Sequence, residues 1–157
     1  MAYQQIIYEQ LKNHLYTLYG ASHEDCDALY LRNLLNFRAI SLTLFHAALN
    51  QYRSREIYYA SLTDYEITLH LLYEEAGEIV SDLNRIPLSL TLKILELRLQ
   101  RVLRSTDAEF QTSVAGMNKY FEERTKRSLQ PFANTPVLRE LKWGDLPGKL
   151  FSLTPGS

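Results

Sequence analysis

The chain has 157 residues, of which 46% are hydrophobic and 22% charged, and it contains a single cysteine. This size and composition fit one globular domain with a buried core. They exclude a disulfide scaffold, a collagen-like repeat and a disordered chain. The formal net charge is −1, so the chain as a whole lacks the basic excess that is typical of nucleic-acid-binding proteins.

The sequence also bears on the compartment in which the protein works. Its first residues lack the basic and apolar regions of a secretory signal. No apolar run reaches the roughly 18 residues that a membrane-spanning helix requires. Cys26 has no second cysteine with which to form an internal disulfide. We therefore expect an intracellular, cytoplasmic protein without a membrane partner.

Apolar residues recur at helical spacing in the first third of the chain. They predict a first helix that begins near Tyr3 and closes at Gly20. A capping sequence at residues 22–25 precedes a second helix, which ends at about Tyr52. Around residues 51–62 the pattern weakens, which predicts a kink or a loop.

Thr63 and Glu66 form a capping-box sequence, which predicts a third helix that extends to about Leu83. Pro87 then ends this stretch. Residues 88–103 fit a strand, because leucines alternate, and also a helix, because leucines recur every three or four positions. We favour the helix because the apolar pattern is too long for a typical strand.

A second capping box at residues 106–109 predicts a fifth helix that ends near Arg127. Five helices with short connections predict an all-α fold, a single-domain bundle over residues 1–128. Residues 129–157 differ from the bundle, because they hold four of the five prolines. We expect them to form an extended, irregular C-terminal arm and not an independent domain.

The arm holds more large apolar side chains than a disordered tail would, which indicates that it packs against a surface. That surface is either the chain's own bundle or another chain, namely a protein partner or the second copy of a homodimer. Both alternatives remain open from the sequence. The candidate anchors for a partner are Leu138, Leu141, Trp143, Leu146 and Phe151.

Charge is distributed unevenly between two of the predicted helices. Residues 63–84 hold six acidic and no basic side chains, whereas residues 88–105 carry a net charge of +3. We expect these helices to be antiparallel neighbours with complementary faces, in which each exposed ion pair adds about 0.2–1 kcal/mol. Alternatively, Arg98, Arg101 and Arg104 fan over about 120° of helix and bind an anionic partner such as phosphate groups.

The sequence has no glycine-rich phosphate loop, no nucleophile elbow and no Cys-x-x-Cys pair. A column of ligand-type side chains recurs every four residues: His70, Glu74, Glu78 and Asp82. Such a column would share one helix face and could hold a metal ion. An acidic face that contacts basic neighbours is the simpler interpretation, so we expect no cofactor and no metal site.

The expected function is that of a non-enzymatic protein–protein interaction module, such as an adaptor, a chaperone or a subunit of a larger assembly. The 11 tyrosines favour such a surface modestly, because tyrosine suits half-buried positions at interfaces. One alternative is a helical subunit that contacts nucleic acid through the arginine patch. A second is a metal-dependent enzyme that uses the column of His70, Glu74 and Glu78.

Overall fold

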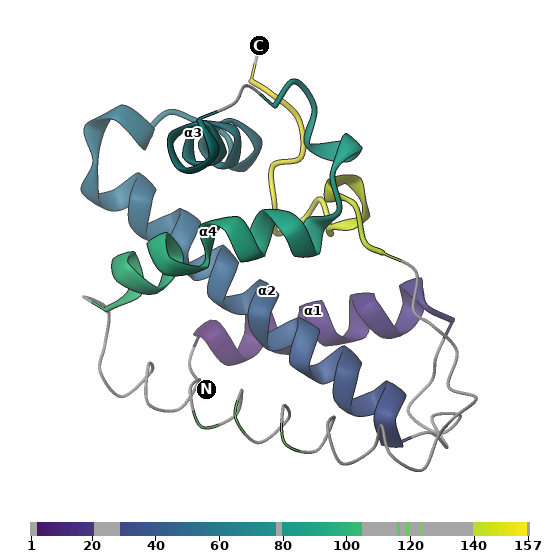
Figure 1. The fold of residues 1–157 in the computed structure, drawn as a ribbon. Coiled ribbons are helices and arrows are strands. Elements are labelled where there is room, and N and C mark those ends of the chain that lie inside the picture. The colour runs from purple at the N-terminus through teal and green to yellow at the C-terminus, as the bar shows by residue number, and fades with distance from the viewer. Residues whose placement is uncertain are drawn as a thin grey trace. The chain divides into compact units, whose positions relative to one another are not determined.

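The computed structural model describes residues 3–20, 29–77, 80–104 and 140–156, together with Gly116, Lys119 and Glu123. These residues are all-helical, without strands, which confirms the predicted fold class (Figure 1). The helices are α1 (Tyr3–Leu18), α2 (Leu29–Arg55), α3 (Asp64–Ala76) and α4 (Leu88–Leu103), and the 3₁₀ turns are η1 (Ile57–Tyr59), η2 (Leu83–Arg85) and η3 (Trp143–Asp145). None of the helices in these residues is both long and apolar enough to cross a membrane.

The chain divides into two compact units. Among the described residues, the first unit holds 3–20 and 29–44 together with Gly116, Lys119 and Glu123, and the second unit holds 45–77, 80–104 and 140–156. Helix α2 therefore supplies residues to both units. The C-terminal segment falls in the second unit, together with α3 and α4.

The helices of the first unit follow the predicted apolar spacing. Helix α1 buries a stripe that includes Leu11 and Leu15. It stops before Gly20, whose φ of +67° lies in the left-handed region that glycine adopts most readily. The hydroxyl of Tyr16 donates to Oδ1 of Asn36 at 3.2 Å, so a buried hydrogen bond joins α1 to α2.

Several predicted features lie outside the described residues. They include the capping sequence at 22–25 and the second capping box at 106–109. Of the predicted fifth helix, Gly116, Lys119 and Glu123 are described, and all three are helical. The break predicted around residues 51–62 is confirmed, because α2 ends at Arg55 and is followed by η1.

Helix α3 begins at the predicted capping box. Oγ1 of Thr63 accepts a hydrogen bond from the Glu66 amide at 3.2 Å, and Oε1 of Glu66 accepts one from the Thr63 amide at 3.0 Å. The expected extension of this helix to Leu83 is wrong. Helix α3 ends at Ala76, because Gly77 adopts the left-handed conformation with a φ of +69° and caps it.

Residues 88–103 form helix α4, which settles the choice between strand and helix. Its buried side chains recur every three or four positions, at Leu88, Thr91, Leu95, Leu99 and Leu103. Helices α3 and α4 pack against each other. Figure 1 shows α3 nearly along its axis while α4 runs across the view. The two helices therefore cross, and the expected antiparallel arrangement is wrong.

The C-terminal segment, residues 140–156, supplies part of the core of the second unit. Nε1 of Trp143 donates to the carbonyl of Leu153 at 3.0 Å. The ring of Phe45 on α2 lies edge-on to Trp143, with 6.1 Å between the ring centroids, and stacks on Phe151 at 5.8 Å. The amide of Leu88 donates to the carbonyl of Leu141 at 2.8 Å. Of the two alternatives for the arm, this segment shows packing on its own chain.

We predict that Trp143→Ala lowers the free energy of unfolding by about 3–5 kcal/mol, because it removes a large buried aromatic side chain. Ile57→Ala is the control: its side chain is exposed, so we expect a change within about 0.5 kcal/mol. Urea denaturation followed by circular dichroism measures both values. Equal stability of Trp143→Ala and the unaltered protein would show that the segment lies outside the core.

Candidate functional site: an aromatic surface supported by side-chain hydrogen bonds

Large apolar side chains gather at the surface of the second unit where η1 meets α3. Ile57 is 95% exposed, Tyr58 62% and Tyr73 53%. The ring of Tyr58 lies 5.0 Å from the ring of His70, and Tyr73 follows His70 by three positions, which makes them neighbours on α3. We call Ile57, Tyr58, His70 and Tyr73 the aromatic surface.

Tyr59 fixes the position of η1 against α3. This residue is buried, and its hydroxyl lies 2.8 Å from Nδ1 of His70 and donates to Oε1 of Glu74 at 3.2 Å. Its ring also packs edge-on against Tyr52 and Tyr58. Burial, and then the charge of Glu74, raise the pKa of Tyr59 above its ordinary value of 10.0. The hydroxyl therefore stays protonated. Its hydrogen bonds hold η1, and with it the aromatic surface, in place against α3.

Glu74 connects the hydrogen bonds of Tyr59 to α4. Its Oε2 lies 3.2 Å from Nη1 of Arg98, and Nε of Arg98 lies 3.4 Å from Oε1 of Glu75. Partial burial raises the pKa of Glu74, but the charge of Arg98 and hydrogen bonds from Arg98 and Tyr59 lower it below its ordinary value. The charge complementarity that we expected between these two helices is confirmed at this contact.

The predicted column of ligand-type side chains is only partly assembled. His70 and Glu74 lie together on α3, with 2.9 Å between Nδ1 and Oε1. Asp82 lies beyond the end of that helix, where its carboxylate accepts from a backbone amide of η2 at 2.9 Å. Glu78 lies outside the described residues. Within the residues that the structure describes, no group of three His, Cys, Asp or Glu side chains could hold a metal ion.

The three arginines of the predicted anionic-partner patch do not act together. Arg98 is half-buried and pairs with Glu74 and Glu75, whereas Arg101 and Arg104 are exposed. A spacing of three residues turns each successive side chain by about 60° around the helix. The first arginine therefore meets α3 and the last two face solvent. Sequence spacing alone could not show where α3 would lie.

The predicted anchors of the arm are not available to a partner in this arrangement. Four of them are buried in the second unit: Leu141, Trp143, Leu146 and Phe151. The fifth, Leu138, lies outside the described residues. The exposed residues of the aromatic surface were missed as a site, because adjacent tyrosines such as Tyr58 and Tyr59 look alike in sequence. Only the packing of η1 shows which of the two is exposed.

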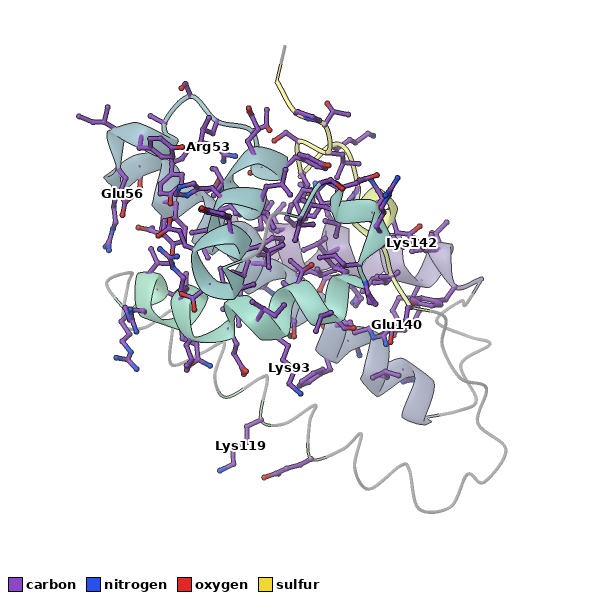
Figure 2. All side chains as sticks on the ribbon, turned by 45° about the horizontal axis from the view of Figure 1, so that its top comes forward. Arg53, Glu56, Lys93, Lys119, Glu140 and Lys142 are labelled. Carbon is purple, nitrogen blue, oxygen red and sulfur yellow. The ribbon has the colours of Figure 1, made fainter. Side chains whose placement is uncertain are left out.

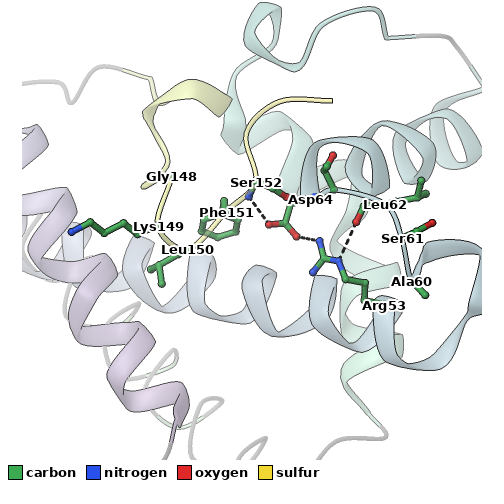
Figure 3. A pocket seen from close by; sticks show the side chains of 11 residues that line it. Arg53, Ala60, Ser61, Leu62, Asp64, Gly148, Lys149, Leu150, Phe151 and Ser152 are labelled. Carbon is green, nitrogen blue, oxygen red and sulfur yellow. Dashed lines mark hydrogen bonds and ion pairs between the residues drawn. The ribbon is translucent and has the colours of Figure 1, made fainter. Parts of the chain in front are cut away.

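A polar pocket of about 470 Å³ lies between the C-terminal segment and the loop that leads into α3 (Figure 3). Asp64, which is buried, forms its charged wall. Its carboxylate accepts hydrogen bonds from Arg53 and, at 2.8 Å, from the amide of Ser152. Its own amide donates to the Ser152 hydroxyl at 2.5 Å. Because these groups satisfy one another's hydrogen-bonding capacity, we interpret this side of the pocket as a structural junction between the two segments.

His46 is a buried titratable group beside this junction. Its ring lies edge-on to Phe151, with 5.5 Å between the ring centroids. Burial lowers the pKa of His46 below its ordinary value of 6.5; Asp64 and a backbone hydrogen bond with Leu150 oppose the shift, and Arg53 adds to it. The neutral imidazole is therefore the form that fits the folded unit.

Comparison with known proteins gives no relative from which a function could be inferred. No protein-family model, no curated protein and no solved structure matches the chain. A functional assignment therefore depends on the side chains described above.

We predict that His46 makes stability depend on pH. Because its pKa is lower in the folded than in the unfolded state, the unfolded state binds more protons near and below pH 6.5. The contribution of His46 is complete above that pH and decreases as the pH falls toward the lowered value. His46→Gln is therefore expected to reduce the loss of unfolding free energy between about pH 7.5 and about pH 5.5.

Urea denaturation at each pH measures this loss, so a constant destabilisation by the substitution does not affect the comparison. Gln10→Ala, an exposed and non-titrating substitution on α1 in the first unit, is the control and is expected to keep the pH dependence of the unaltered protein. An identical pH dependence in His46→Gln would contradict the assignment.

Proposed function

We propose that the protein is a non-enzymatic interaction module that binds a protein partner through the aromatic surface, as an adaptor, a chaperone or a subunit of a larger assembly. The observation that carries this proposal is the adjacent exposure of Ile57, Tyr58 and Tyr73. Tyrosine is enriched among the residues that dominate binding energy at interfaces. It supplies a large contact area at a low cost in conformational entropy.

The hydrogen bonds beneath the surface support the same proposal. Tyr59 joins η1 to His70 and Glu74 on α3, so a partner would meet side chains that are already positioned. A preorganised surface loses less entropy on binding than a flexible one. This arrangement favours binding by a surface that changes little in shape.

The rim of the aromatic surface is polar and carries both signs of charge, because the exposed Arg55 directly precedes Glu56. Glu56 immediately precedes η1 and is exposed at the edge of the unit (Figure 2), and Glu74 adjoins His70. Interfaces commonly combine an apolar centre with a polar rim. The proposed partner therefore presents an apolar pocket or patch that polar side chains flank.

The two alternative functions receive less support. A metal-dependent enzyme would use His70, Glu74 and Glu78, but Glu74 is already paired with Arg98 and Glu78 lies outside the described residues. Nucleic-acid binding through the predicted patch would need all three arginines, but Arg98 is paired with Glu74 and Glu75. The side chains on which the proposed interaction module depends are exposed in this structure.

We predict that a photoreactive p-benzoylphenylalanine in place of Tyr58, introduced in the protein's own cells, cross-links to one discrete protein partner. The same group in place of Gln10, which is exposed on α1, is expected to give no such product. Adding Ile57→Ser and Tyr73→Ala is expected to lower the yield at Tyr58 by about tenfold or more, because both side chains contribute apolar contact.

Lys149→Ala, an exposed substitution in the C-terminal segment, is the matched control and should leave the yield unchanged. Denaturing gels followed by mass spectrometry identify and quantify the products. The proposal is wrong if positions 58 and 10 give the same products, or if the double substitution leaves the yield at Tyr58 unchanged.

A further inference from the structure

The side of α4 that faces away from its buried leucines carries a second set of exposed apolar side chains. Leu90 is 45% exposed and Leu97 is 72% exposed. Three exposed cations lie on the same side of the helix: Lys93, Arg101 and Arg104. The five positions follow one another at intervals of three or four residues, so they form one stripe along the helix. We call this set the outer stripe.

The cations of the outer stripe are available for a partner. Within the described part of the chain, none of Lys93, Arg101 and Arg104 takes part in an ion pair. Figure 2 shows Lys93 extending outward from α4. Glu96 is the single acidic residue of the helix. Solubility would account for the cations, but it does not account for the exposed Leu90 and Leu97 on the same side of the helix.

We propose that the outer stripe binds an acidic amphipathic helix of a partner protein. Leu90 and Leu97 are seven residues apart, which is the heptad spacing at which side chains on one face of a helix meet a partner helix. Leu90 and Leu97 would pack against apolar side chains of the partner helix, in the manner of helix recognition by an apolar stripe. Carboxylates beside those side chains would pair with the three cations.

A second copy of this chain fits the outer stripe poorly. Antiparallel pairing centred on Leu97 would place Lys93 opposite Arg101 and Leu90 opposite Arg104. Parallel pairing would place each cation beside its own equivalent. Like charges in contact across an interface disfavour both arrangements. The charge of the stripe therefore selects an acidic partner.

Nucleic acid also fits the outer stripe less well than an acidic helix does. Phosphate groups would pair with the cations, but the backbone of a nucleic acid offers no apolar surface to Leu90 and Leu97. The stripe is separate in residues and in charge from the aromatic surface, so this inference does not rest on the proposed function.

The probe for this proposal is a fluorescein-labelled peptide of about three heptads, with leucine at the a and d positions and glutamate at e and g. A control peptide has the same composition, with its leucines distributed around the helix. Fluorescence anisotropy with the full chain is expected to show saturable binding of the amphipathic peptide. Binding should be at least about tenfold tighter than that of the control peptide.

Substitutions in the outer stripe test which side chains bind the probe. Leu97→Ser leaves the core intact, because Leu97 is exposed, and is expected to weaken binding about tenfold. The double variant Lys93→Glu, Arg101→Glu is expected to lose the acidic peptide and to bind a version with lysine in place of glutamate. Lys149→Glu is the control for a reversed charge elsewhere and should bind as the unaltered protein does. Circular dichroism verifies that every variant is folded.

Three results would overturn the proposal. The first is that the amphipathic peptide and its control bind equally tightly, or that Leu97→Ser binds the amphipathic peptide as tightly as the unaltered protein does. Either result would indicate attraction by charge alone. The second is the absence of saturable binding up to about 100 μM peptide. The third is that the peptide does not bind, whereas oligothymidylate or phosphatidylcholine–phosphatidylserine vesicles do bind and require Lys93 and Arg101 for it. That result would assign the stripe to nucleic acid or to a membrane surface.

Discussion

Asp64 is buried at the first position of α3, where it joins segments that are far apart in the sequence. Its carboxylate accepts hydrogen bonds from Arg53 of α2 and from the amide of Ser152, while its own amide donates to the Ser152 hydroxyl (Figure 3). A buried carboxylate is costly unless a positive charge and hydrogen bonds compensate it. The start of a helix also favours a negative charge. The position of the C-terminal segment, and with it the core around Trp143, depends on this junction.

Once the C-terminal segment is part of the core, its apolar residues no longer indicate a partner. Within the described part of the second unit, the large apolar side chains that remain exposed lie on η1, α3 and α4. The rim of the aromatic surface includes both Arg55 and Glu56, whereas the outer stripe is basic through Lys93, Arg101 and Arg104. The two surfaces therefore differ in charge, and the two proposals give them different partners.

The helices could be predicted from the sequence because their signals are local. The capping box of Thr63 and Glu66 marked the start of α3, and the length of the apolar pattern favoured a helix over a strand for α4. The end of α3 could not be predicted in the same way, because the apolar pattern continues beyond Gly77 and only the backbone conformation stops the helix. The sequence left the burial of Trp143 as one of two alternatives, and it predicted complementary helix faces without showing that Arg98 would be the arginine that meets α3. Both depend on contacts between segments that are distant in the chain.

Native-state hydrogen exchange at two amides tests most directly whether the C-terminal segment belongs to the core of the second unit. The amide of Tyr65 donates to the carbonyl of Ser152 at 3.1 Å, and the amide of Ser152 donates to Asp64. We predict that both amides are protected as strongly as that of Leu71 within α3, because all of them become accessible only when the unit opens. Exchange of the Ser152 amide at the rate of an unstructured peptide, with the amide of Leu71 still protected, would contradict this account.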